Sequence, residues 1–403
     1  MLYCTYKMCK EASCMEQSFI SDYCKEPTII TPNDGAHYFF GYYDMRATQG
    51  NRHLAHRVRF MDRLPEADDV AEIGYLEDGK FYCVATTTAW NFQQGAMLQY
   101  HPFLKDTIYY NVFHNGKECT VTHNYTTGEK KYTDRATACV SADGKWGLSV
   151  NFARIFAFRP GYGYAESVDP NADIAAPTDD GIFLTDMESG TSSLLVDYAA
   201  MAKVCGFGPE KKILVNHITF NPACSRYVAL VRDFSIPPQT GWTTVLMAGD
   251  LEGNIWTLPS DRYASHYVWQ DAQHLIIHCS AENREKRSLY RINTTDGTFT
   301  ELDMPYFHEY KKGDIHCNVS PDGRYVIGDG YPWEGYRVVV GYNLETGAYR
   351  VLFKSRTVIP PVVDIRCDLH NLFAFDGKYI SYDTTENGKR QIAVVPVDCL
   401  LNF

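Results

Sequence analysis

The stretch His316-Cys-Asn-Val-Ser-Pro-Asp-Gly323 decides the fold, because its outline returns along the second half of the chain. A histidine opens it, and an Asp-Gly turn follows six residues later. The opening histidine recurs with gaps of 266−217 = 49, 316−266 = 50 and 370−316 = 54 residues. A residue type that returns about every 50 residues in one register marks the same place on successive structural repeats. The histidines of this series are His217, His266, His316 and His370.

Turn dipeptides divide the whole chain into modules of similar length. Asp-Gly and Asn-Gly, as at 143–144, 322–323 and 387–388, tolerate positive φ and close tight hairpins between short β-type runs. We expect four strands in each module, and seven such modules close into a ring. The modules open at His37, Trp90, Ala136, His217, His266, His316 and His370. The prediction is an all-β fold, a seven-bladed β-propeller of four-stranded antiparallel blades over residues 28–403, after a poorly ordered leader at 1–27.

Composition and charge narrow the classes of ligand. The net charge of −11 lacks the basic footprint of a nucleic-acid-binding protein, and an acidic ligand would need a local basic pocket. No run approaches the roughly 20 apolar residues of a membrane span. Residues 1–23 show no apolar core of a secretory signal, which predicts a cytoplasmic location and free thiols. Four cysteines crowd this leader, either as reduced thiols or as a metal knuckle: Cys4, Cys9, Cys14 and Cys24.

The histidine series predicts a metal site. If each module is a blade, the four histidines open inner strands and can converge near the axis. Convergent imidazoles bind divalent transition metals, with zinc favoured here and manganese possible. The alternative is that each histidine only hydrogen-bonds a neighbouring strand. Cys317 is left out of the ligand set because alternate side chains of a strand point to opposite faces.

Aromatic and amide side chains of the first two modules could bind a sugar. Tyr43 lies in the opening motif of module one, and Trp90 precedes Gln94 and Gln99 in module two. A flat ring beside amide donors suits a carbohydrate. The same residues could equally be core packing around the ring.

The third module carries an insertion of about 30 residues, and long loops on a rigid scaffold often carry function. Guanidinium groups there can hold a carboxylate through two hydrogen bonds, and a tyrosine beside cations can serve as a base. Arg232 and Arg366 are further candidates for the same pocket, whereas surface ion pairs would explain the insertion's arginines without any ligand. The candidates in and beside the insertion are Asn151, Arg154, Arg159, Tyr162 and Tyr164.

Several ordered motifs resemble those of seven-bladed propeller polysaccharide lyases, ulvan-lyase-like proteins above all and oligogalacturonate lyases more distantly. The resemblance implies β-elimination at a uronic acid of an acidic oligosaccharide or polysaccharide, with Arg154 neutralising the carboxylate and a metal on the histidines. The motifs are Phe40-Gly-Tyr-Tyr-Asp44, His56-Arg-Val-Arg-Phe-Met-Asp-Arg63, Ala89-Trp-Asn-Phe-Gln-Gln-Gly95, Asn151-Phe-Ala-Arg154, Arg159-Pro-Gly-Tyr-Gly-Tyr-Ala165 and Arg366-Cys-Asp-Leu-His370.

One position departs from this pattern. Ala138 stands where the resemblance places a tyrosine that acts as base and acid. Tyr162, Tyr164, Tyr43 or a histidine would then take over its role. Otherwise the chain is a non-catalytic propeller that binds a glycan or a protein partner.

Overall fold

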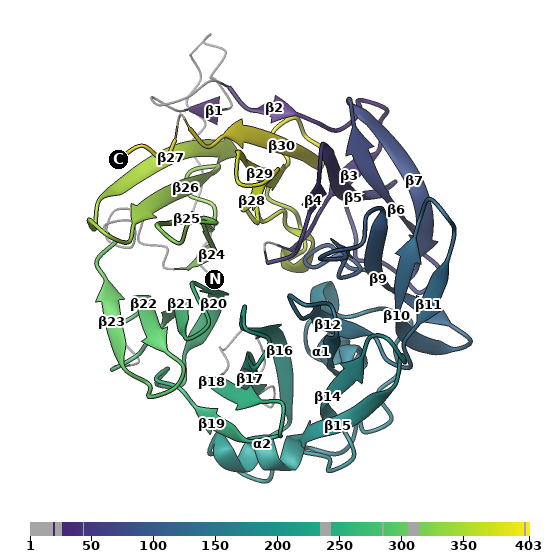
Figure 1. Ribbon diagram of the computed structural model, residues 1–403, viewed down its shortest axis with the longest axis vertical. Coiled ribbons are helices and arrows are strands. Elements are labelled where there is room, and N and C mark those ends of the chain that lie inside the picture. Colours follow the sequence, from purple (N-terminus) through teal and green to yellow (C-terminus); the bar gives the residue numbers. More distant parts are fainter. Residues whose placement is uncertain are drawn as a thin grey trace, which may run out of the picture.

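Seven antiparallel sheets stand around one axis in the computed structural model, as Figure 1 shows. It describes residues 19–20, 26–42, 44–233, 243–283, 286–304, 314–398 and 400–403. The predicted seven-bladed β-propeller is confirmed. Five blades begin within two residues of the predicted openings, whereas blade four begins at Ile213, four residues before His217, and blade two begins at Gln99, nine residues after Trp90. Tyr43, the four leader cysteines and most of the predicted leader lie outside the described residues.

Each of the first four blades begins at the axis and runs outward in sequence order. Blade one contains β3 (His37–Phe39), β5 (Arg52–Val58), β6 (Ala71–Glu77) and β7 (Lys80–Thr87), with β4 (Thr48–Gln49) paired to β5. Blade two contains β8 (Gln99–Tyr100), β9 (Thr107–His114), β10 (Lys117–Asn124) and β11 (Lys130–Tyr132). Blade three contains β12 (Thr137–Val140), β13 (Trp146–Ser149), β14 (Gly181–Asp186) and β15 (Ser192–Asp197). Blade four contains β16 (Ile213–Phe220), β17 (Arg226–Asp233), β18 (Thr243–Asp250) and β19 (Ile255–Thr257).

The last three blades repeat this order, and the N-terminal region completes two of them. Blade five contains β20 (Ala264–Trp269), β21 (His274–Cys279), β22 (Ser288–Asn293) and β23 (Phe299–Leu302). Blade six contains β24 (Ile315–Val319), β25 (Tyr325–Gly330), β26 (Tyr336–Asn343) and β27 (Tyr349–Arg356), with β1 (Phe19–Ile20) at its edge. Blade seven contains β28 (Leu372–Ala374), β29 (Tyr379–Thr384) and β30 (Gln391–Pro396). Its fourth strand is β2 (Thr28–Ile29), so the two ends of the chain close the ring (Figure 1).

Packing between neighbouring blades supplies the core. Strand β16 is buried along its whole length: it packs against β12 of blade three, and its Thr219 hydroxyl accepts a hydrogen bond from Trp269 of blade five at 3.0 Å. Leu230 and Leu246 of blade four share one apolar cluster with Leu275 and Ile277 of blade five. Each such side chain stabilises the fold by about 1.5–3 kcal/mol when removed from water.

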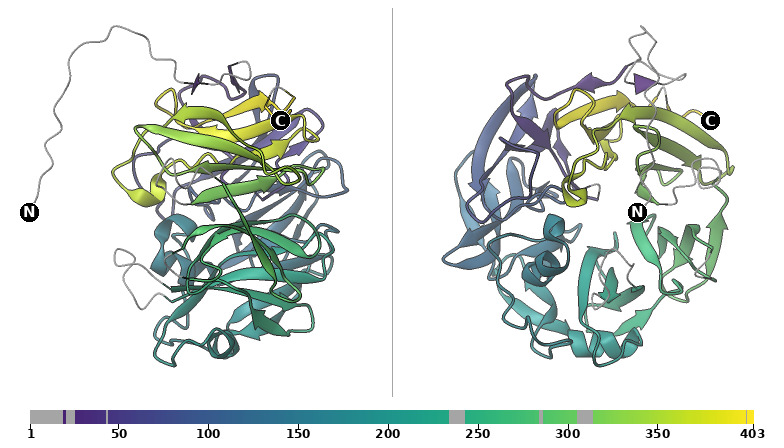
Figure 2. Two further views of the ribbon diagram at one scale, coloured as in Figure 1. Left: turned by 90° about the vertical axis from the view of Figure 1, so that its left-hand side faces the viewer. Right: turned by 180° about the vertical axis from the view of Figure 1, so that it is seen from behind.

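The insertion of blade three connects β13 to β14 and forms α1 (Phe152–Phe158) and the 3-10 turn η1 (Pro160–Tyr162). Asn151 caps α1 by accepting a hydrogen bond from the Arg154 amide at 2.8 Å. In the left view of Figure 2, α1 and the yellow-green turn η3 (Val363–Ile365) lie on the same face of the ring. Helix α2 (Tyr198–Val204) follows β15, and no helix among the described residues is long and apolar enough to cross a membrane.

A buried histidine of β5 holds the loop that opens module two. His56 is fully buried, stacks on Phe39 and accepts a hydrogen bond at Nε2 from the Ala96 amide at 2.9 Å. Gly95 fits beside it only because it has no side chain, since an added Cβ would lie 2.2 Å from the imidazole. Burial lowers the pKa of His56 to about 4, although the carbonyls of Phe39 and Phe40 oppose the shift.

This pKa predicts an acid-sensitive contribution to stability. Because the unfolded chain binds the proton at a higher pH than the folded chain does, the stabilisation by neutral His56 is complete above pH 6.5. It is lost as the pH falls toward 4. We expect the difference in unfolding free energy between the wild type and a His56→Gln variant to shrink by about 3 kcal/mol over this window. Denaturant titrations at several pH values measure it, and a difference that is constant with pH would contradict the assignment.

Candidate functional site

The four repeated histidines lie together at the axis. Ring centroids are 5.8 Å apart for His217 and His266, 4.0 Å for His266 and His316, and 4.7 Å for His316 and His370. Each residue exposes 8 % of its surface or less. The imidazoles therefore share one buried environment, whereas four separate structural roles would have scattered them. Their role as metal ligands stays a prediction.

Local irregularities of the backbone turn these side chains toward one another. The pairing of β16 with β17 shifts register at His217, and that of β20 with β21 shifts at His266. His217 and His370 have positive φ values of 55° and 45°, which are costly for a residue with a Cβ. Only His316 lies in regular pairing, opposite Asp329. Bulges of this kind often re-aim side chains beside functional sites.

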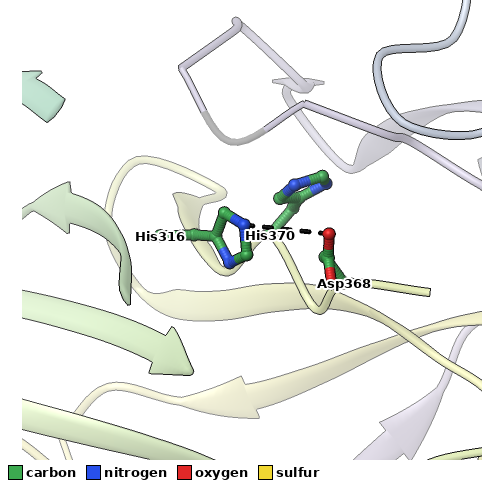
Figure 3. A group of neighbouring side chains, drawn as sticks. All are labelled: His316, Asp368 and His370. Atoms are coloured by element: carbon green, nitrogen blue, oxygen red, sulfur yellow. Dashed lines mark ion pairs between the residues drawn. The ribbon is translucent and has the colours of Figure 1, made fainter. Parts of the chain in front are cut away.

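A smaller group within this cluster has the geometry of a metal site. Ligand atoms of His316, Asp368 and His370 all lie within 4.8 Å of one another, and Figure 3 shows the three side chains converging. Asp368 Oδ2 makes no hydrogen bond of good geometry among the described residues, although the Arg366 guanidinium lies 2.8 Å away. Two imidazoles and a carboxylate suit zinc or manganese, so the donor set fits a divalent ion. Asp368 was not among the residues predicted from the sequence.

Carboxylates lie beside the Nδ1 atoms of several histidines. Asp314 lies 3.0 Å from His266 Nδ1 and 3.2 Å from His278 Nδ1, and Asp329 lies 3.2 Å from His316 Nδ1. Such partners fix the orientation of an imidazole and raise its basicity toward a metal. Burial would raise the pKa of Asp314, but His266 and His278 hold it well below its usual range.

Burial keeps three of the four imidazoles neutral at neutral pH. It lowers the pKa of His217 and His370 well below 6.5, with Arg232 and His316 respectively adding to the shift. The pKa of His266 falls to about 4, although Asp314 opposes the change. Burial also disfavours the charged form of His316, yet Asp329 and Asp368 raise its pKa. Neutral imidazoles offer the lone pairs that metal binding or proton abstraction requires.

Two arginines share the Asp368 carboxylate. Arg337 Nη2 lies 2.5 Å from Oδ1, and Arg366 donates to the same oxygen from Nε at 3.1 Å. Burial would raise the pKa of Asp368, but Arg366 and Arg337 hold it well below its usual range. Arg366 also donates to the Tyr162 hydroxyl at 2.9 Å. A single carboxylate thus connects the candidate metal group to a cation and a phenol.

Cations and phenols surround His217. The ring of Tyr162 lies 5.9 Å from that of His217, and the Arg159 guanidinium lies 4.2 Å from the centroid of the Tyr162 ring. Arg232 of β17 is buried nearby, and desolvation lowers its pKa to about 10. Of the predicted residues, Arg159, Tyr162 and Arg232 therefore lie beside His217.

Two neighbours of His217 come from the first two modules. The Tyr42 hydroxyl lies 3.0 Å from His217 Nδ1, and the Gln94 amide nitrogen lies 3.3 Å from it. Tyr42 had not been predicted, although it belongs to the Phe40–Asp44 motif that was singled out. The backbone amides of Phe40 and Gly41 each donate a hydrogen bond to the Asp383 carboxylate, which holds this segment at the axis.

The contacts of Arg154 differ from those that its predicted role at a substrate carboxylate requires. Its side chain is fully buried, and Nε donates to the Ile213 carbonyl at 2.6 Å. The other nitrogens approach Asp169 and three carbonyl groups of the insertion, among them those of Ile174 and Ala175. Arg154 therefore anchors the insertion to β16, and this geometry argues against its predicted role at a substrate carboxylate.

Four other predicted site residues are also held away from the histidines. Trp90 is 1 % exposed and donates to the Asp69 carbonyl at 2.8 Å, so it is core packing and not a sugar platform. Tyr164 is buried, stacks on Phe152 and accepts from Asn111. Asn151 caps α1. Gln99 accepts a hydrogen bond from Arg46 in a different pocket.

Fold and site together define a seven-bladed propeller with a buried histidine–carboxylate centre at its axis. No protein-family model matches the chain, and no curated protein sequence matches it. Among solved structures, oligogalacturonate lyase in complex with manganese gives a TM-score of 0.65 at 14% identity, over 94% of this chain and 96% of that one. The tricorn protease gives 0.53 at 10% identity, over 94% of this chain and 34% of that one. A prolyl endopeptidase structure gives 0.52 at 10% identity, over 91% and 48%. At such identities the likeness shows the fold alone.

Proposed function

We propose that this protein is a metal-dependent lyase that cleaves uronate-containing oligosaccharides by β-elimination. The observation that carries the proposal is the buried group of His316, Asp368 and His370, with arginines and a tyrosine within reach of the neighbouring His217. A solved structure of the same fold is an oligogalacturonate lyase with manganese, which supports the same choice. Zinc and manganese both suit the donor set.

In the proposed reaction, a base takes the proton at C5 of the uronate, and its electron pair forms the C4–C5 double bond. The C4–oxygen bond breaks, and an acid protonates the leaving oxygen. A bound divalent ion would polarise the uronate carboxylate as a Lewis acid. His316, Asp368 and His370 would hold this ion. Arg159 and Arg232 are the nearby cations suited to the substrate carboxylate, and they take the role that the resemblance implies for Arg154.

The geometry suggests roles for His217 and Tyr162. His217 is neutral because of its lowered pKa, so it can accept the C5 proton, and Tyr42 at Nδ1 would hold its tautomer and orientation. Tyr162 can donate to the leaving oxygen, because the hydrogen bond from Arg366 stabilises the phenolate that forms. These two residues would fill the place that Ala138 leaves open.

Product formation tests the proposal directly. Metal-replete protein is incubated with oligogalacturonate, ulvan oligosaccharides and other uronate glycans, and the unsaturated product is followed by its ultraviolet absorbance. We expect turnover with at least one uronate glycan, loss of turnover after chelation, and its return with zinc or manganese. Glycans without uronic acid are the matched control. No product across the uronate panel with metal-replete protein would reject the lyase.

The alternative is a propeller that binds a glycan without cleaving it. Ala138 favours it, because this buried residue of an apolar cluster offers no group for proton transfer. Calorimetry with the same panel separates the two: saturable binding without product supports the binder, whereas product that disappears in a His217→Gln variant supports the lyase.

A further inference from the structure

A second pocket lies at the other end of the inner strands. His217, His266 and His316 lie within β16, β20 and β24, and His370 lies just before β28. This pocket is lined instead by the last residues of β12, β16 and β20, which are Val140, Phe220 and Trp269. Its volume is about 210 Å³. We call it the axial pocket.

A layer of tyrosines separates the axial pocket from the histidines. Tyr267 is buried, and its hydroxyl donates to the His217 carbonyl at 3.1 Å. Tyr42 is buried beside it, with its hydroxyl on His217 Nδ1. Thr219, which lines the axial pocket, donates to the Tyr267 hydroxyl at 3.3 Å, so Tyr267 lies between the pocket wall and His217. The axial pocket is thus a separate compartment.

A hydrogen-bond donor and a hydrogen-bond acceptor, Arg46 and Asp44, both line the axial pocket. Arg46 donates from Nε to the Tyr100 carbonyl at 2.8 Å and from Nη2 to Gln99 at 2.5 Å, which leaves Nη1 without a partner among the described residues. Asp44 has no hydrogen-bond partner within the part of the chain that the structure describes. Burial raises the pKa of Asp44 to about 7, with Arg46 opposing the change. Unused acceptors and donors in a pocket wall are what a ligand's hydroxyl groups would satisfy.

The remaining wall is apolar and aromatic. The Trp269 indole is held by its hydrogen bond to the Thr219 hydroxyl at 3.0 Å, and Phe220, Met45 and Pro222 complete the surface. A fixed aromatic ring beside a carboxyl, a guanidinium and an amide is a combination that suits a polyhydroxylated ring. Asp44 can accept a hydrogen bond from a hydroxyl group or, when protonated, donate one, and Arg46 donates, so the pair suits an uncharged hydroxylated ligand.

We propose that the axial pocket is a second ligand site that takes one neutral monosaccharide. Its volume corresponds to roughly seven water molecules. It lies below the ~300–1,000 Å³ of pockets that take drug-sized ligands, which limits the occupant to about one ring. A uronate is disfavoured because its carboxylate would face Asp44. The site is independent of the proposed lyase, since none of its lining residues belongs to the histidine cluster.

Ligand-detected NMR tests the proposal with the full chain and a panel of glucose, galactose, mannose and xylose, each at millimolar concentration. We expect saturation transfer to at least one of them, and galacturonic acid should be at least tenfold weaker than galactose at displacing that sugar. Ala142→Trp at the exposed rim should block the pocket without disturbing the core, and Glu252→Trp on an exposed outer turn is the matched control. Asp44→Asn should weaken binding at least threefold.

The outcomes separate this site from the histidine centre. Binding that survives His370→Asn but is lost in Ala142→Trp supports the axial pocket, whether or not the protein proves to be a lyase. Binding that survives Ala142→Trp, or that is lost in His370→Asn, overturns the proposal and leaves the lyase unaffected. No saturation transfer with any neutral sugar of the panel also overturns it.

Discussion

A His370→Asn variant is expected to lose its divalent metal and, with it, the proposed lyase activity. Removing one of three ligand groups should weaken metal binding by more than about 100-fold, since losing only a supporting partner of a ligand costs 10–100-fold. Asparagine is chosen because it tolerates the positive φ of 45° at this position, so the backbone need not move. Elemental analysis after dialysis and kcat/KM on the active glycan are the two measurements.

The matched control for this prediction is His114→Asn, because His114 is exposed on β9 and far in sequence from the centre. The control should keep both metal and activity. If the His370→Asn variant still bound one equivalent of metal, the ion would bind somewhere other than the His316, Asp368 and His370 group. Loss of metal without loss of activity would make the ion structural.

Electrostatics couples the metal group to the rest of the centre. Asp368 carries two guanidinium partners and still offers Oδ2 to the space between His316 and His370. A cation bound there would share the Asp368 carboxylate with Arg337 at Oδ1 and with Arg366 at both oxygens. The same carboxylate fixes Arg366, which in turn donates to Tyr162. The proposed metal site and the proposed acid are therefore held by one network and should respond together to changes at Asp368.

Periodicity made the fold and the meeting of the histidines predictable. Blade openings follow from turn dipeptides and a repeat near 50 residues, and both are local features of the sequence. The sequence predicted that each histidine opens an inner strand, but His217 is the fifth residue of β16 and His266 is the third of β20. The recurrence of these histidines was visible in the sequence. The bulges that turn them toward the axis were not, because a register shift depends on the pairing partner.

Residues outside the strands were predicted less well for a related reason. Asp368 and His370 lie in an irregular segment between η3 and β28, where neither a period of two nor a period of 3.6 can say which side chains share a face. The residue type of Trp90 suggests a sugar platform, but only the folded core shows that Phe39, Phe60 and Phe92 surround it. Arg154 shows the largest difference between its predicted and its observed role. Most of its partners are backbone carbonyl groups, and because every residue has one, the sequence could not identify them.

Replacing Arg154 with methionine is expected to lower the free energy of unfolding by about 3–5 kcal/mol, the usual result of removing one partner of a buried ion pair. Methionine fills similar space but leaves Asp169 and several carbonyl groups of the insertion without their donor. Arg159→Met is the matched control. Its guanidinium is more exposed and pairs with Asp364 at 3.4 Å, so stability should fall by less than about 1 kcal/mol while activity declines. Denaturant unfolding and kcat/KM measured on both variants separate anchoring from catalysis. If Arg154→Met were as stable as the wild type yet inactive, Arg154 would act at the substrate carboxylate, and the roles proposed for Arg159 and Arg232 would be wrong.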